Sequence, residues 1–147
     1  MPHSFISNLH HVVFSTKQRQ PWIRPELQEA MRGYIGGIAR KNGMVALAAG
    51  GIADHMHVLL ALPATMPVAK AVQLIKAGSS KWFREKHQPR FFWQEGYASF
   101  SVSKSNLRQV TNYIHNQEQH HRKRDFIGEL RQLLRLHEIV FDDSMLD

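Results

Sequence analysis

The chain has 147 residues, of which 43% are hydrophobic and 21% are charged, values typical of one globular domain with a packed core. With 19 Lys and Arg against 12 Asp and Glu, the net charge is +7, which favours polyanions such as nucleic acids as partners. The absence of Cys excludes disulfides, thiolate metal ligands and cysteine nucleophiles, so His, carboxylate or amide groups would have to hold any metal.

The first half of the chain has the patterns of a strand, a helix and two more strands. Residues 9–14 predict the first strand, which a basic, Pro-containing loop follows. From Pro25 onwards, apolar residues recur at helical spacing until an Asn-Gly pair supplies a stop. The predicted buried stripe of this helix consists of Leu27, Met31, Tyr34 and Ile38. Residues 44–49 and 55–62 are short apolar runs separated by GGIAD, which predicts two neighbouring strands.

The second half predicts three helices and one or two strands. Residues 67–86 form an amphipathic helical pattern. Residues 91–93 are extended in character, and residues 97–102 alternate as a half-buried strand does. A helix over about 106–121 and a last helix over about 125–137 complete the chain. This order predicts one α+β domain over residues 1–147, with a ferredoxin-like antiparallel β-sheet and helices packed on it.

A His-x-His motif lies at the start of a predicted strand. Strand alternation sends His55 and His57 to one face and Met56 to the other, so the two imidazoles can chelate one ion. Alone, the motif is weak, because ten His in this chain produce about 0.7 such matches by chance. A core or surface histidine pair is the alternative interpretation.

A second candidate group lies on the helix predicted over 106–121. Tyr113 and Gln117 are four residues apart and therefore share one helix face, and His120 lies on that face one turn further along. The face flanks the apolar stripe of Leu107, Val110 and Ile114. From there a side chain can reach the edge of the sheet. An amphipathic packing Tyr beside a solvated Gln is the alternative interpretation.

The two groups occur together in sequences that resemble a known family. The run DHMHVLL and the later run FWQEGYASFSVSKSNLRQVTNYIHNQEQHH are similar to the single-tyrosine HUH transposases of the insertion-sequence 200/605 type, a superfamily that includes REP-associated tyrosine transposases. The resemblance covers most of the chain and implies the HUH endonuclease fold. It implies His55, His57 and Gln117 as metal ligands and Tyr113 as the nucleophile.

The resemblance also implies a reaction and partners. The tyrosine would cut single-stranded DNA with hairpin ends, retain the 5′ phosphate as a phosphotyrosine and later rejoin the strands, with Mg²⁺ or Mn²⁺ as cofactor and a homodimer as the assembly. Two imidazoles are softer ligands than Mg²⁺ usually prefers, whereas Mn²⁺ tolerates them. A structural zinc site is the competing interpretation, but Gln is an unusual zinc ligand and Tyr113 would then have no role.

Basic residues supply candidate DNA phosphate contacts, which position a strand without reading its sequence. They lie in the first loop, on the second helix and after the tyrosine helix. The predicted DNA-binding residues are Lys17, Arg19, Lys76, Lys81, Arg84, Arg122 and Lys123, with Arg124 as a further candidate.

The sequence thus predicts a transposase that mobilises an insertion sequence, with several alternatives left open. Within the same chemistry, these are a domesticated HUH nickase acting on repeated palindromes, a relaxase-like enzyme and a replication initiator. Outside it, they are a non-catalytic basic nucleic-acid-binding module and a metal-dependent hydrolase. No apolar run reaches the roughly 18 residues that span a bilayer, and no secretory signal is present. We therefore expect a cytoplasmic, nucleoid-associated protein without membrane contact.

Overall fold

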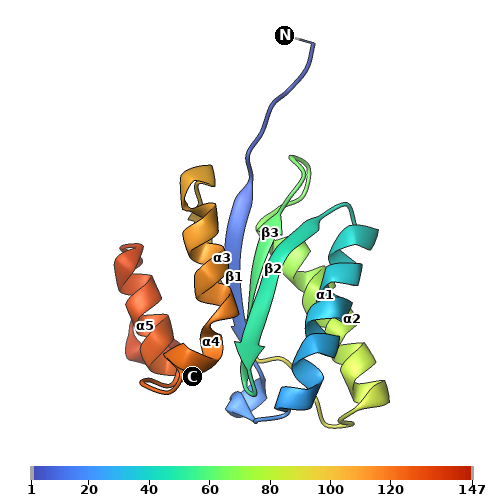
Figure 1. The fold of residues 1–147 in the computed structure, drawn as a ribbon, viewed down its shortest axis with the longest axis vertical. Coiled ribbons are helices and arrows are strands. Elements are labelled where there is room, and N and C mark those ends of the chain that lie inside the picture. The colour runs from blue at the N-terminus through green and yellow to red at the C-terminus, as the bar shows by residue number, and fades with distance from the viewer. Residues whose placement is uncertain (1, 147) are drawn as a thin grey trace.

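The computed structural model describes residues 2–146, whose strands and helices follow the order βαββαβ with three further helices (Figure 1). The elements are β1 Leu9–Ser15, α1 Gln28–Lys41, β2 Val45–Ile52, β3 His55–Ala61, α2 Val68–Lys86, β4 Ala98–Val102, α3 Leu107–His115, α4 Gln117–His120 and α5 Phe126–Leu136. Short 3-10 turns occur at Lys17–Arg19, Pro25–Leu27, Lys104–Asn106 and Asp143–Leu146.

The strands form one antiparallel sheet in the order β2-β3-β1-β4. This is the strand order of a ferredoxin-like sheet, and it confirms the predicted α+β fold. Helices α1 and α2 cover one face of the sheet, and α3, α4 and α5 cover the other (Figure 1). None of the helices formed by residues 2–146 has both the length and the apolarity needed to cross a bilayer.

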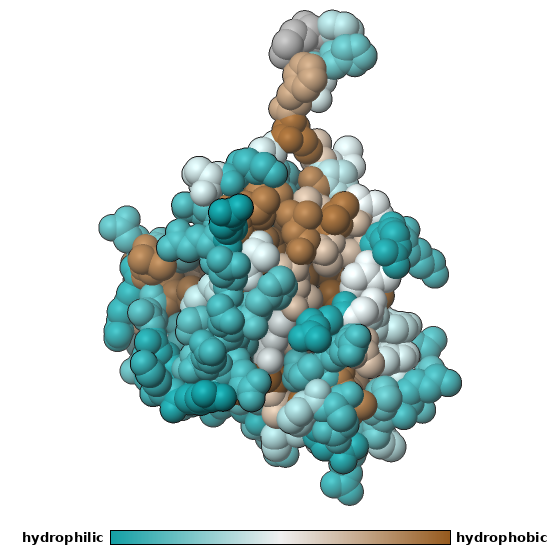
Figure 2. Space-filling view, in the orientation of Figure 1, coloured by the Kyte–Doolittle hydropathy of each residue, from teal (hydrophilic) through white to brown (hydrophobic). Residues whose placement is uncertain are grey.

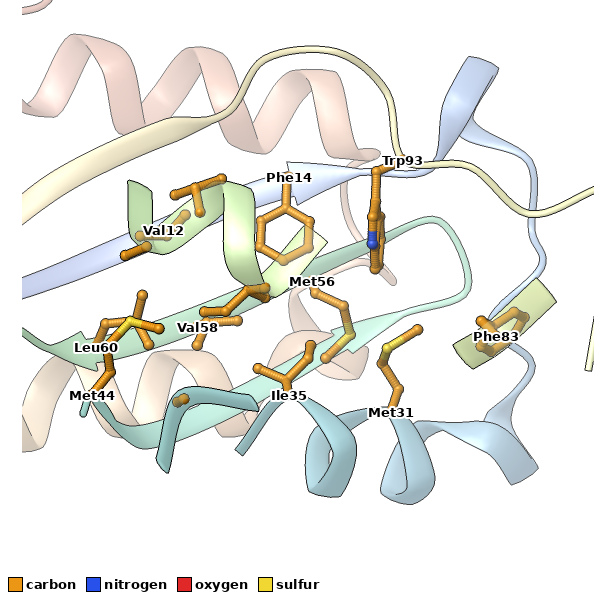
Figure 3. Close-up of a cluster of buried hydrophobic side chains, with 14 of the residues drawn as sticks. Val12, Phe14, Met31, Ile35, Met44, Met56, Val58, Leu60, Phe83 and Trp93 are labelled. Atoms are coloured by element: carbon orange, nitrogen blue, oxygen red, sulfur yellow. The ribbon is translucent and has the colours of Figure 1, made fainter. Parts of the chain in front are cut away.

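Strand alternation gives the two faces different chemistry. On the α1 and α2 face, Phe14, Met56 and Val58 are at most 2% exposed and pack against Met31 and Ile35 of α1 (Figure 3). The opposite residues of the same strands face α3 to α5, and they include three histidines. The large apolar core therefore lies on one side of the sheet, which leaves the other side free to carry polar groups.

One sequence prediction about the core side is wrong in detail. Tyr34 is 38% exposed and stacks on Trp82 with ring centroids 4.5 Å apart, whereas Ile35 is buried in its place. Helix α1 packs against α2 as well as the sheet, and Gly78 allows an approach so close that an added Cβ would lie 2.8 Å from Ile38 Cδ1. Of the one or two strands predicted over 91–102, β4 alone forms, and residues 91–93 contribute a single bridge, between Trp93 and Thr16.

The predicted continuous helix over 106–121 is also wrong. Asn116, with φ −104° and ψ 26°, lies between α3 and α4 and interrupts the helix. Its backbone N–H donates to the carbonyls of Asn112 and Tyr113, which caps α3. The break lies immediately before Gln117.

The surface has one region in which apolar residues gather. In the orientation of Figure 1, the surface over the helices is mainly hydrophilic, and apolar residues gather over the upper part of the sheet (Figure 2). The edge strand β2 contributes Val45, 55% exposed, and Leu47, 43% exposed.

Candidate active site

The two histidines of the His-x-His motif lie on the sheet face that α3 to α5 cover. His55 and His57 are 0% exposed, and Met56 between them belongs to the opposite core. The pairing of β3 with β1 places His57 opposite Val13 and His55 opposite Ser15. The structure therefore confirms that strand alternation sends both imidazoles to one face.

Gln117 reaches this histidine pair from α4. Its side chain is 1% exposed, and its Oε1 lies 3.2 Å from Nε2 of His55. Its Nε2 donates to the backbone carbonyl of Tyr113 at 3.3 Å. The amide oxygen of Gln117 therefore faces His55.

Tyr113 on α3 is half-buried beside the same group. Its hydroxyl donates a hydrogen bond to Oε2 of Glu129. Its ring stacks on His120 with centroids 4.4 Å apart and meets the ring of His57 edge-on at 5.8 Å. Burial, together with the hydrogen bond to Glu129 and its negative charge, raises the pKa of Tyr113 above its usual range. The phenol is therefore protonated at neutral pH when no cation is bound.

The centre of the site is a carboxylate that the sequence did not predict. Glu129 lies on α5, is 1% exposed, and its Oε1 is 3.0 Å from Nε2 of His57 and 3.3 Å from Nε2 of His55. His121, which follows α4, places its Nε2 3.1 Å from the same oxygen and 3.2 Å from Gln117 Oε1. Hydrogen bonds from these histidines hold the pKa of Glu129 far below its usual range despite its burial.

The histidines differ in protonation state because the groups that surround them differ. Burial alone would lower the pKa of His55, but hydrogen bonds to Asp54 and Glu129 raise it to about 9. Burial lowers the pKa of His57 to about 4, against the opposing effect of Glu129. Burial and the neighbouring His57 lower the pKa of His11, whose Nε2 lies 2.7 Å from His57 Nδ1, to about 3.

The donor set fits a divalent cation. His55, His121 and Glu129 offer ligand atoms that lie within 4.8 Å of one another, and the Gln117 oxygen adjoins two of them. Imidazole nitrogens, a carboxylate and an amide oxygen together suit first-row divalent metals. This group, which includes His55 but not His57, can therefore hold a divalent metal.

A cavity of about 360 Å³ opens beside Tyr113, between β4, α3 and α5. Its lining includes Tyr113, His120 and Arg124. One face of the tyrosine is thus accessible from outside, although its hydroxyl is held by Glu129.

The predicted DNA-binding residues fall into two groups. The exposed ones are Lys17, Arg19, Lys81, Arg122 and Lys123. The half-buried pair has partners within the chain. Lys76 donates to the carbonyls of Gln94 and Gly96 at 2.6 and 2.7 Å, and Arg84 donates to the carbonyl of Phe91 at 3.1 Å. Both therefore hold the segment between α2 and β4 in place.

The chain matches known transposases over most of its length. Residues 5–117 match the family described as "Transposase IS200 like". A transposase for insertion sequence element IS200 from Salmonella typhimurium is 29% identical over an alignment of 127 residues, and the alignment covers 82% of this chain and 80% of the relative. The ISDra2 transposase TnpA from Deinococcus radiodurans is 23% identical over an alignment of 115 residues, and the alignment covers 74% of this chain and 82% of the relative.

Solved structures share the fold. A crystal structure described as a transposase from Deinococcus radiodurans R1 superimposes with a TM-score of 0.63 at 23% identity, and covers 78% of this chain and 95% of its own. A REP-associated tyrosine transposase bound to a REP hairpin superimposes with a TM-score of 0.61 at 16% identity, and covers 81% and 72%.

The ferredoxin-like sheet, with two buried histidines on one face and a tyrosine helix across them, is the HUH fold of the tyrosine transposases. The chain belongs to the IS200-like transposase family, and it is a transposase. The nickase and binding-module alternatives are not favoured. The family match ends at Gln117, so His121 and Glu129 lie beyond it.

Proposed function

We propose that this transposase nicks and rejoins single-stranded DNA, with Tyr113 as the nucleophile and a divalent metal, Mg²⁺ or Mn²⁺, held by His55, His57 and Gln117. The observation that carries the proposal is that Tyr113 and both motif histidines contact the same carboxylate, that of Glu129. Glu129 accepts a hydrogen bond from the Tyr113 hydroxyl with one oxygen, and its other oxygen lies 3.0 and 3.3 Å from Nε2 of the two histidines. The nucleophile and the metal donors are therefore neighbours.

The chemistry follows from this placement. A divalent cation bound at these residues would neutralise a phosphate oxygen and favour in-line attack. The Tyr113 oxygen bonds to phosphorus and gives up its proton, while the bond from phosphorus to the 3′ oxygen breaks and that oxygen takes a proton. The 5′ phosphate stays on the tyrosine. Attack by another strand's 3′ hydroxyl reverses the step, so rejoining requires no ATP.

Hairpin-ended single strands are the proposed substrate. The resemblance implies them, and the REP-associated relative was solved on a REP hairpin. The net charge of +7 and the exposed basic residues beyond α4 suit phosphate contacts. We further propose a cytoplasmic, nucleoid-associated homodimer. Because Tyr113 contacts Glu129 of its own chain, each subunit can assemble the site from its own residues.

The test is covalent capture of the strand. Hairpin oligonucleotides from element ends, labelled at the 5′ or 3′ side, are incubated with the native protein and Mn²⁺ or Mg²⁺. We expect the fragment on the 3′ side of the cut to become attached to protein. Tyr113→Phe should abolish the adduct, and Tyr34→Phe, a tyrosine on the opposite face of the sheet, should leave it unchanged.

Two results would contradict the proposal. Cleavage that survives in Tyr113→Phe would indicate a hydrolase with a water nucleophile. Absence of any adduct with the native protein on several element-end sequences would favour a binding module.

A further inference from the structure

We propose that the cavity beside Tyr113 binds one unpaired DNA base, that of the first nucleotide on the 3′ side of the cut. We call this the retained nucleotide, because its 5′ phosphate would stay on the tyrosine. The inference rests on the proposed function and deepens it by naming the base that the chain holds. The cavity has a volume of about 360 Å³, which is at the lower end of the range for small-ligand sites and suits one nucleoside rather than a stretch of strand.

Aromatic rings line the cavity. Phe100 of β4 and His137, which follows α5, are stacked with ring centroids 4.3 Å apart. Tyr113 and His120 form a second stacked pair, with centroids 4.4 Å apart. His11, only 3% exposed, lies between the pairs, with its ring centroid 5.9 Å from that of Phe100 and 6.1 Å from that of Tyr113. Stacking on such rings is how proteins hold unpaired bases of any sequence.

Polar groups at the same cavity can meet the edge of a base. Asn106, Gln109 and Gln132 line the cavity and are exposed, and their amides can both donate and accept hydrogen bonds. Nε2 of His120 is buried and has no hydrogen-bond partner among residues 2–146. Because an unpaired buried polar atom is unfavourable, a base edge in the cavity can supply what this nitrogen lacks.

The ring of His137 is already fixed in its stacked position. Its Nδ1 donates to the backbone carbonyl of Leu133 at 2.9 Å, and its neighbour Phe100 is 2% exposed within the core beside α5. A ring that is held before the ligand arrives loses little side-chain entropy on binding. The cavity therefore presents a preorganised stacking surface.

In-line attack decides which base can reach the cavity. The attacking tyrosine oxygen and the leaving 3′ oxygen lie on opposite sides of phosphorus, so the nucleotide on the 5′ side of the cut departs on the side away from Tyr113. The retained nucleotide stays on phosphorus through its 5′ oxygen, next to the tyrosine. Since Tyr113 lines the cavity, the base within reach is that of the retained nucleotide.

Tyr113 adjoins both the cavity and the metal donors. Its hydroxyl donates to Glu129, whereas the cavity lining includes none of His55, His121 and Glu129. The base site and the metal donors are therefore separate. Arg124 also lines the cavity and is exposed, so its cation suits a phosphate of the same nucleotide.

The test is a base-by-base scan of binding to one element-end hairpin. The Tyr113→Phe protein, which keeps the ring and cannot form the adduct, is titrated with strands that have an abasic site at each unpaired position in turn. Fluorescence anisotropy measures Kd. We expect one sensitive position, at which loss of the base weakens binding about tenfold. A 2-aminopurine placed there should lose fluorescence in the complex, because it stacks on the rings.

A second substitution links the sensitive position to the cavity. His137→Ala, added to the Tyr113→Phe protein, should weaken binding of the complete strand several-fold but hardly change the Kd of the strand that is abasic at that position. His87→Ala is the matched control, because His87 is an exposed histidine beside buried Phe83 on the other face of the sheet. It should change neither Kd.

Covalent capture with the native protein then locates the cut and separates the two proposals. The base site is supported if the sensitive position is the first nucleotide on the 3′ side of the cut. If the adduct forms but no position is coupled to His137, the base site is wrong and the proposed function stands. A coupled position on the 5′ side of the cut would overturn the assignment to the retained nucleotide. A coupled position without any adduct would support base binding in the cavity and contradict the proposed function.

Discussion

At the scale of single residues, the buried cluster holds neighbouring histidines in opposite protonation states. His55 has a raised pKa of about 9, whereas His57 and His11 have pKa values lowered to about 4 and 3. Asp54 and Glu129 stabilise the charge on His55, and burial without a comparable partner keeps His11 neutral. Folding therefore weakens proton binding at His11 and His57 but strengthens it at His55, so stability depends on pH in two opposite ways.

Stability of the metal-free protein should consequently be greatest near pH 6.5. Between about pH 6.5 and 4, unfolded His11 and His57 bind protons that the folded state excludes, so stability falls as pH decreases. His55 has the opposite sign: its contribution is full below pH 6.5 and is lost as pH rises toward 9. Urea unfolding in EDTA across this range measures both slopes, each limited to about 1.4 kcal/mol per pH unit and proton.

The control for the acid slope is His11→Gln, whose amide can replace the Nε2 contact to His57 but does not titrate. We expect a shallower loss of stability below pH 6.5 than in the native protein. An unchanged acid slope in this variant would show that His11 is not one of the groups responsible.

The sequence led to four of the site residues because two regular patterns and a family resemblance coincided on them. Glu129 was missed although a signal existed: it lies between Phe126 and Leu133, within the apolar stripe of α5, where a charge needs a buried partner. His121 follows Gln117 by four residues and so shares its face, a spacing that also makes it a candidate. What the sequence could not give is the docking of α5, because long-range packing decides it.

At the scale of elements, local sequence patterns predicted where the strands and helices lie, but not where the structure departs from those patterns. The break at Asn116 precedes α4, which contacts β2 of the sheet, and a continuous helical pattern does not reveal it. The segment at 91–93 has strand-like residues, but its hydrogen bonds go to separate partners. Arg84 donates to the Phe91 carbonyl, the Lys17 N–H donates to the Phe92 carbonyl, and the Phe91 N–H donates to the Gln88 carbonyl. Tertiary contacts override local preference in both cases.

The contact between α3 and β2 allows a test at this scale. Gly50 lies so close to α3 that an added Cβ would be 2.4 Å from the carbonyl oxygen of Ile114, the residue after Tyr113. Gly50→Ala must push α3 away from the sheet. We expect a loss of about 1–3 kcal/mol in the free energy of unfolding, measured with urea, and a slower rate of phosphotyrosine formation because the nucleophile moves.

The matched control is Gly33→Ala on α1, where an added Cβ has no atom within 4 Å. Removing a glycine from a helix interior should stabilise the protein by about 0.5–1 kcal/mol and leave the adduct rate unchanged. Equal stability of Gly50→Ala and the native protein would mean that α3 does not require this close approach.

At the scale of the whole molecule, the sheet separates stability from chemistry. The α1 and α2 face carries the large continuous apolar core, whereas the α3 to α5 face has two smaller apolar clusters beside the polar site. The exposed cations Arg122 and Lys123 lie in the turn between α4 and α5. Binding to DNA should therefore depend on where positive charge lies as well as on its total.

Two double variants with equal charge distinguish location from total charge. Arg122→Gln with Lys123→Gln removes cations beside the site, and Arg40→Gln with Lys41→Gln removes exposed cations at the end of α1. Each lowers the net charge from +7 by two, to +5.

If both cations of the turn contact phosphates, the first variant should bind a single-stranded hairpin more weakly, and the slope of log affinity against log salt should fall by about 1.4, or 0.7 per contact. The second should keep the native slope, because long-range attraction is screened beyond about 10 Å at 0.1 M salt. Equal losses in the two variants, measured by fluorescence anisotropy over a salt series, would show that only the overall charge attracts the strand and that the turn between α4 and α5 does not touch it.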